Sequence, residues 1–127
     1  MTNQKSKLLE ETFNSFFDIS TNVSKDIELL DQIVADNVMG YGTAIDEKIV
    51  SLVDFKEMIK RQGVQSQGFD IDWKRTPILR RLSLDGNVAI RSDDITLVIN
   101  TQGEIMKKLP RFSLTLEFQN AAWKVIH

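Results

Sequence analysis

The sequence contains no cysteine, a single histidine and only two prolines in 127 residues. The lack of cysteine excludes disulfides, thiolate metal ligands and a cysteine nucleophile. Because His127 is the only histidine, the sequence also excludes a histidine-rich metal cluster and any Ser-His-Asp triad that does not use this residue. We therefore expect neither a metal ion nor a cofactor.

The sequence also lacks a large excess of either charge, because it has 16 Lys and Arg and 18 Asp and Glu, which give a net charge of -2. Nucleic-acid binders normally present a basic face, so we expect no nucleic-acid partner. No apolar run approaches the ~20 residues that cross a bilayer, and the polar segment 1–7 lacks the apolar middle of a secretory signal. These features predict a cytoplasmic protein without a membrane partner.

The length and composition fit one hydrophobic core and therefore a single domain over residues 1–127. In the first half, apolar residues recur three and four positions apart over 8–17 and include three phenylalanines, which predicts an amphipathic helix. We expect a second helix from an N-cap at Ser24 to about Ala35. A third should begin at the capping box Ser51–Asp54 and end at Gly63.

Strand patterns fill the rest of the chain. Residues 38–50 predict two short strands joined around Asp46-Glu47, and from Phe69 the apolar residues follow a period of two. The four later strands are expected at 69–84, 88–99, 104–118 and 123–127, with Pro77 and Pro110 as interruptions. The order α-α-β-β-α-β-β-β-β predicts an α+β fold. A curved, mostly antiparallel sheet should wrap around the N-terminal helices and leave a cone-shaped pocket.

Four segments are distinctive: the aromatic first helix, Gly40-Tyr41-Gly42-Thr43 followed by Asp46-Glu47, the third helix, and the closing Trp123-Lys124-Val125-Ile126-His127. On these segments the chain resembles the SnoaL-like branch of the nuclear-transport-factor-two-like (cystatin-like, ketosteroid isomerase-like) superfamily. It is similar to the variety attached to bacterial signalling proteins. Relatives commonly continue past the His of the closing segment with a second His and a Ser. Here either the chain is part of a longer protein or half of that pattern is missing.

The resemblance implies a pocket between the sheet and a long helix, and frequent homodimers formed through the sheet. The family includes isomerases, polyketide cyclases and dehydratases as well as binding domains without catalysis. Pocket tyrosines of the isomerase relatives donate a hydrogen bond to a ligand carbonyl, and Tyr41 is the corresponding candidate here. Tyr41 could equally pack its ring and point its hydroxyl group at water.

Other side chains have both a functional and a purely structural interpretation. His127 could act as a base, a sensor or a ligand donor near neutral pH, or simply end a strand. By strand parity, Arg91 and Asp93 share the side of Ile95 and Leu97, whereas Asp94 lies on the other side. A carboxylate in an apolar cavity could move a proton, but these residues could equally form cross-strand pairs. We regard Asp94 and Arg91 as possible polar pocket groups. The expected pocket-lining residues are Phe13, Phe17, Tyr41, Phe55, Ile59, Trp73, Phe112, Trp123 and His127.

Three functional hypotheses follow. The first is a non-catalytic binding or sensory domain for a small apolar or amphipathic molecule, acting within a homodimer. The second is a small cofactor-free enzyme of the isomerase, cyclase or dehydratase type, which needs only one carboxylate base and one or two hydrogen-bond donors. The third is a dimerisation module whose pocket is incidental.

Overall fold

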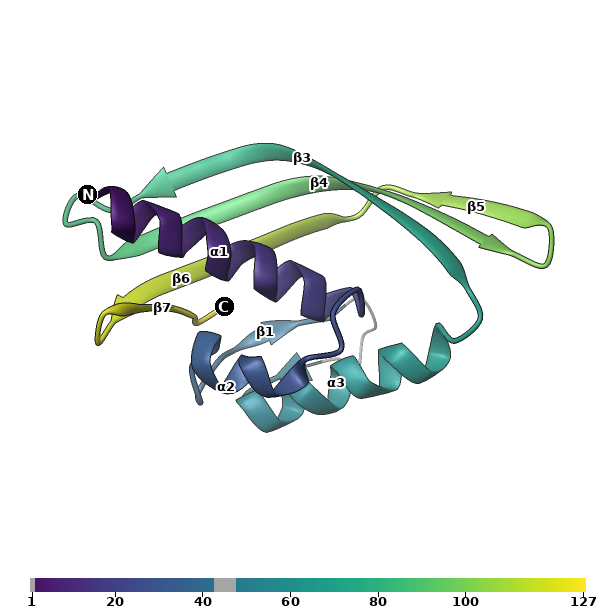
Figure 1. The fold of residues 1–127 in the computed structure, drawn as a ribbon, viewed down its shortest axis with the longest axis horizontal. Coiled ribbons are helices and arrows are strands. Elements are labelled where there is room, and N and C mark those ends of the chain that lie inside the picture. The colour runs from purple at the N-terminus through teal and green to yellow at the C-terminus, as the bar shows by residue number, and fades with distance from the viewer. Residues whose placement is uncertain (1, 43–47) are drawn as a thin grey trace.

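The computed structural model describes residues 2–42 and 48–127 and has the predicted α+β fold, with helices on the inner face of a bent antiparallel sheet (Figure 1). None of the helices in these residues has the length and hydropathy to cross a bilayer. The elements are α1 (Asn3–Ser20), a 3₁₀ turn (Ile27–Leu29) leading into α2 (Leu30–Ile33), β1 (Gly40–Tyr41), β2 (Lys48–Ile49), α3 (Leu52–Gln65), β3 (Asp70–Leu82), β4 (Val88–Thr101), β5 (Glu104–Lys108), β6 (Arg111–Gln119) and β7 (Ala122–Val125).

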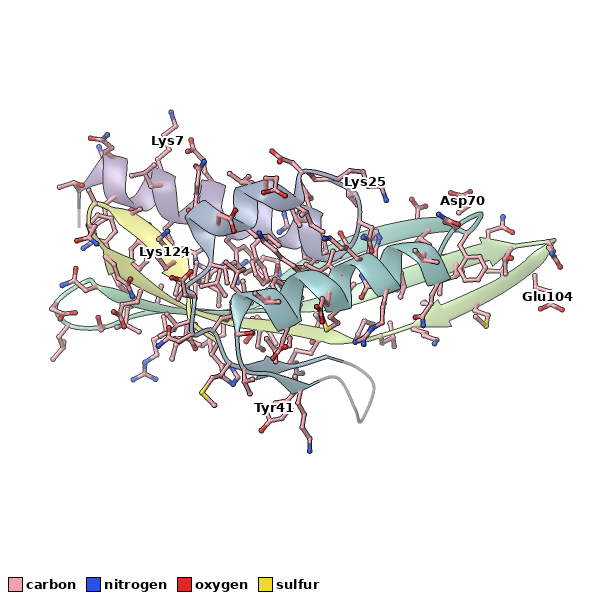
Figure 2. The ribbon with its side chains drawn as sticks, turned by 90° about the horizontal axis from the view of Figure 1, so that it is seen from below. Lys7, Lys25, Tyr41, Asp70, Glu104 and Lys124 are labelled. Atoms are coloured by element: carbon pink, nitrogen blue, oxygen red, sulfur yellow. The ribbon has the colours of Figure 1, made fainter. Side chains whose placement is uncertain are left out.

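Strand β4 organises the sheet because it is long enough to pair with three neighbours. β3 pairs with it along almost its whole length on one side. On the other side β6 pairs with its first half and β5 with its second half, while β7 pairs with β6. The second half of β4 therefore extends with β3 and β5 as an arm beyond α1 (Figure 1), with Glu104 at its far end (Figure 2).

The two prolines disturb the sheet where the sequence predicts. Pro77 lies in the edge strand β3, at a register shift between Pro77 and Leu79. Such a shift suits a residue that cannot donate a hydrogen bond to a neighbouring strand. Pro110 separates β5 from β6, and its carbonyl accepts a hydrogen bond from Ile95 N at 2.9 Å. The change of direction at Pro110 lets one long segment pair with β4 in two places.

Helix α1 turns its apolar stripe toward the sheet, as its periodicity predicts. Its buried residues are Leu9, Phe13, Phe16, Phe17 and Ile19, and burying each such side chain is worth roughly 1.5–3 kcal/mol. Thr2 caps the N-terminus of the helix, and its hydroxyl group accepts a hydrogen bond from Lys5 N at 3.1 Å. The indole of Trp123 donates to the Lys5 carbonyl at 3.0 Å and so attaches α1 to β7.

Helix α3 begins at the predicted cap but does not end at Gly63. The Ser51 hydroxyl accepts from Asp54 N at 3.2 Å. The helix continues to Gln65, so the predicted end is wrong. A Cβ atom at Gly63 would lie 3.0 Å from Asn22 Nδ2. The glycine therefore permits a close approach between α3 and the segment after α1, where Gln62 Nε2 also donates to the Ser20 carbonyl at 2.6 Å.

The second helix is shorter than predicted. Ser24 accepts a hydrogen bond from Asp26 N within the connection, and the helical turns run only from Ile27 to Ile33. Val34 is extended because it bridges Val125 of β7 in parallel fashion. The two short strands after it are present as β1 and β2, while Thr43 and the Asp46-Glu47 turn lie outside the described residues.

Candidate ligand-binding cavity

A cavity of about 880 Å³ lies between α1, α3 and the inner face of the sheet. Its walls are mostly aromatic and aliphatic, because the apolar sides of the helices and the inward positions of the strands meet there. The apolar lining residues are Phe16, Phe17, Val38, Met39, Ile49, Phe55, Met58, Phe69, Ile71, Trp73, Ile95, Leu97, Ile99, Pro110, Phe112, Leu114 and Val125.

Stacked and edge-on aromatic rings form part of this wall. Phe16 of α1 stacks on Phe55 of α3, with ring centroids 5.2 Å apart and an interplanar angle of 10°. Phe17 meets Trp73 of β3 and Phe112 of β6 edge-on, at 5.9 and 5.2 Å. Aromatic pairs in such geometries contribute about 0.5–1.5 kcal/mol beyond their buried area. The rings hold the two helices against the sheet while leaving the space between them open.

The polar lining groups come from two parts of the chain. One set lies at the last turns of α1 and α3 and comprises Ser20, Thr21, Gln62, Gln65 and Ser66. The other set comes from β1, the corner between β5 and β6, and the segment after β7; it comprises Tyr41, Lys108, Arg111, Ser113 and His127. Tyr41 is 78% exposed, on the small hairpin that projects to one side of the sheet (Figure 2). The cavity thus combines an apolar body with hydroxyl, amide and cationic groups.

Six of the nine predicted lining residues border this cavity: Phe17, Tyr41, Phe55, Trp73, Phe112 and His127. Phe13, Ile59 and Trp123 do not. All three are buried in the core. Phe13 lies edge-on to Phe112, with 6.2 Å between ring centroids, and Trp123 is held by the Lys5 carbonyl. Periodicity identifies side chains that turn inward, but it does not separate those beside the void from those packed solidly.

The two charged candidates on β4 lie away from the cavity lining. Parity places them correctly, since Arg91 is on the inner face and Asp94 on the outer face. Arg91 forms an ion pair with Glu10 beneath α1. The Asp94 carboxylate accepts a hydrogen bond from Arg111 Nε at 3.1 Å. Both charges are therefore satisfied by neighbouring elements, and neither side chain contributes to the lining.

Sequence reasoning missed Lys108 and the polar groups at the ends of α1 and α3. Lys108 lies opposite Leu97 in the β4–β5 pairing, and opposite residues project to the same face. Only the register of that hairpin assigns it to the cavity. Gln62 immediately precedes the expected helix end at Gly63, and Gln65 follows it. The helical pattern therefore assigned neither side chain to the pocket.

The shifted pKa values among the described residues belong to two groups outside the cavity lining. Hydrogen bonds from the Ser83 hydroxyl and from Asn87 N lower the pKa of Asp85. The hydrogen bond to Asp31 raises the pKa of Lys56. In the described part of the chain, no three His, Cys, Asp or Glu side chains gather as metal ligands would.

A family model described as a SnoaL-like domain matches residues 9–127 of this chain. No curated protein matches the sequence significantly. The match spans nearly the whole chain and includes the cavity-lining elements.

Similar solved structures show the same fold. One is a ketosteroid isomerase-like protein from Erwinia carotovora atroseptica, with 10% identity, coverage of 98% of this chain and 93% of that chain, and a TM-score of 0.74. A nuclear transport factor 2-like superfamily protein from Salmonella enterica serovar Typhimurium has 15% identity, coverage of 100% and 89%, and a TM-score of 0.69. A protein of the same type and unknown function from Pseudomonas putida has 11% identity, coverage of 100% and 85%, and a TM-score of 0.71.

Proposed function

The chain belongs to the SnoaL-like domain family, and on this premise we propose that it is a non-catalytic binding or sensory domain for a small, largely apolar molecule. The observation that carries the proposal is the cavity of about 880 Å³ under α1 and α3. Pockets for small ligands typically measure about 300–1,000 Å³ and combine apolar walls with a few polar groups. The space and its lining meet both criteria.

The chemistry of the lining favours binding over catalysis. Among the described lining residues none is Asp or Glu. General acid–base catalysis in a cofactor-free isomerase or dehydratase commonly depends on such a carboxylate. Hydroxyl, amide and cationic groups are sufficient to orient a bound molecule.

A cofactor-free enzyme is the second candidate. Tyr41 and His127 border the same cavity, so a phenol hydroxyl group and an imidazole are available there. The name of the Erwinia protein points in the same direction. Turnover of a ketone or polyketide that is lost in both Tyr41→Phe and His127→Ala would favour this candidate over the first.

We also propose that the outer face of the sheet pairs with a second copy of the chain, as part of a larger signalling protein. This face exposes Leu79 and Ile90 close together and Ile105 farther along β4, among polar neighbours. Exposed apolar side chains that group on one face can mark an interaction surface. Sedimentation velocity on the isolated chain measures whether the pair forms.

The binding proposal is tested by obstructing the cavity. Leu97 and Val98 are consecutive, partly buried residues of β4, but only Leu97 lines the cavity. Phenylnaphthylamine, a neutral aromatic probe whose fluorescence rises in apolar surroundings, should bind the wild-type chain saturably. Leu97→Trp should weaken binding at least about ten-fold, the equivalent of roughly 1.4 kcal/mol. The matched control Val98→Trp should leave the affinity unchanged.

Fluorescence is excited above the tryptophan band, and both variants are checked for cooperative thermal unfolding. A wild-type chain that binds no probe would overturn the proposal. Equal effects of Leu97→Trp and Val98→Trp in folded protein would do the same, because the probe would then lie elsewhere.

A further inference from the structure

Among the described residues, the charged side chains at the cavity have one sign. The chain has 18 acidic and 16 basic residues, yet the described lining includes the basic residues Lys108, Arg111 and His127 and no Asp or Glu. We propose that the ligand is an amphipathic anion: an aromatic or aliphatic body carrying one carboxylate or sulfonate group, with the negative charge at Lys108. This inference rests on the proposed binding function and specifies the class of ligand.

Lys108 is the cation best placed for this role. It pairs with Leu97 across the β4–β5 hairpin, and Leu97 lines the cavity, so both side chains project to the inner face. The preceding residue, Lys107, pairs with Val98 and projects to the outer face. Among residues 2–42 and 48–127, no carboxylate forms an ion pair with Lys108. With respect to these residues, its ammonium group is available to a ligand.

Arg111 contributes less because its charge is already paired. Its Nε donates to the Asp94 carboxylate at 3.1 Å, and Asp94 belongs to the outer face of β4. The permanent, uncompensated charge in the described lining is thus the one on Lys108.

A second cation reinforces the potential from behind the aromatic wall. The Arg75 guanidinium lies 4.5 Å from the ring centroid of Phe17, which lines the cavity. Its Nη2 donates to Asn14 Oδ1 at 2.9 Å, whereas its Nη1 is buried and has no hydrogen-bond partner among the residues that the structure describes. A partly buried positive charge is screened less than a fully exposed one. Arg75 therefore adds a second positive charge beside a ring of the cavity lining.

An apolar ligand body and an anionic group would divide the binding energy between them. Burial among the rings supplies most of the affinity, at about 25 cal/mol per Å² of apolar surface. An exposed ion pair at the rim adds up to about 1 kcal/mol, or roughly five-fold in affinity. The charge thus determines which apolar molecules are preferred.

Two probes with the same ring system separate these contributions. Anilinonaphthalene sulfonate is phenylnaphthylamine with one added sulfonate group. At low salt the wild-type chain should bind the sulfonate about five-fold more tightly than the neutral probe, and the preference should shrink as salt is added. Lys108→Gln should abolish the preference without changing the affinity for the neutral probe. Lys107→Gln removes the same charge from the opposite face and should keep the preference.

The outcomes separate this inference from the proposed function. If the neutral probe binds but the sulfonate binds no better, or if Lys108→Gln and Lys107→Gln act alike, the anionic ligand class is wrong while the binding function stands. If neither probe binds, the proposed function itself fails. Both lysines lie on an exposed hairpin, and cooperative unfolding of each variant verifies that the fold is intact.

Discussion

Asp93 is 1% exposed, beneath α1, and its carboxylate accepts a hydrogen bond from Arg80 Nη2 at 2.7 Å. The same guanidinium also donates through Nη1 to the backbone carbonyls of Leu79 and Ser92. Arg80 therefore bridges the irregular part of β3 and the middle of β4. A buried charge is tolerated only when it is paired in this way.

Removing the Asp93 carboxylate should destabilise the folded chain. Asp93→Ala leaves Arg80 without its charged partner and should lower the free energy of unfolding by about 2 kcal/mol or more. The matched control is Asp94→Ala, because the ion pair of Asp94 with Arg111 is half-exposed. This substitution should lower the free energy of unfolding by no more than about 0.5 kcal/mol. Urea denaturation of the two variants measures the difference, and equal losses would show that the Arg80 pair does not stabilise the inner face.

For single residues, the sequence predicted which face of the sheet a side chain lies on, but not which residue it forms an ion pair with. The alternation along β4 assigns Arg91 and Asp93 to one face and Asp94 to the other, because successive side chains in a strand alternate. It does not indicate that Arg91 would find Glu10 of α1 or that Asp93 would find Arg80. Those pairings depend on where α1 crosses the sheet.

Among the elements, the sheet's outer face allows the proposed homodimer to be tested. Ile90 is 38% exposed and lies near Leu79, which is 41% exposed, on this face. Ile90→Glu would bury a charge in the contact, so we expect the dimer to dissociate into monomers, with the dissociation constant raised about thirty-fold or more, or roughly 2 kcal/mol.

Val53→Glu is the control for this substitution, because Val53 is 64% exposed on α3, away from the sheet. Sedimentation velocity over a concentration series measures both variants. Equal dissociation constants for Ile90→Glu and the wild-type chain would contradict a contact through this face.

Periodicity predicted the existence and type of most elements, while their ends depended on contacts between elements. The early end of the second helix follows from the bridge between Val34 and Val125, which are 91 residues apart in the chain. The continuation of α3 past Gly63 follows from the close approach to Asn22. Neither contact leaves a local signal, since glycine ends helices more often than it accommodates a neighbouring loop.

For the molecule as a whole, the central feature is a bent sheet only partly filled by its helices. The aromatic rows of α1 and the alternation of the strands predict two apolar surfaces that must face each other. The volume left between them depends on how far the sheet curves away toward the arm. For that reason a pocket could be predicted, whereas Ser20, Gln65 and Lys108 were recognised in it only from the structure.

The most direct test of the cavity as a binding site is methyl NMR of isoleucine-labelled protein titrated with phenylnaphthylamine. Ile49, Ile71, Ile95 and Ile99 line the cavity, whereas Ile90 and Ile105 belong to the outer face of the sheet. We predict saturable shifts for the four cavity isoleucines and unchanged resonances for the two outer ones. Shifts confined to Ile90 and Ile105, or no saturable shift at any isoleucine, would contradict the account.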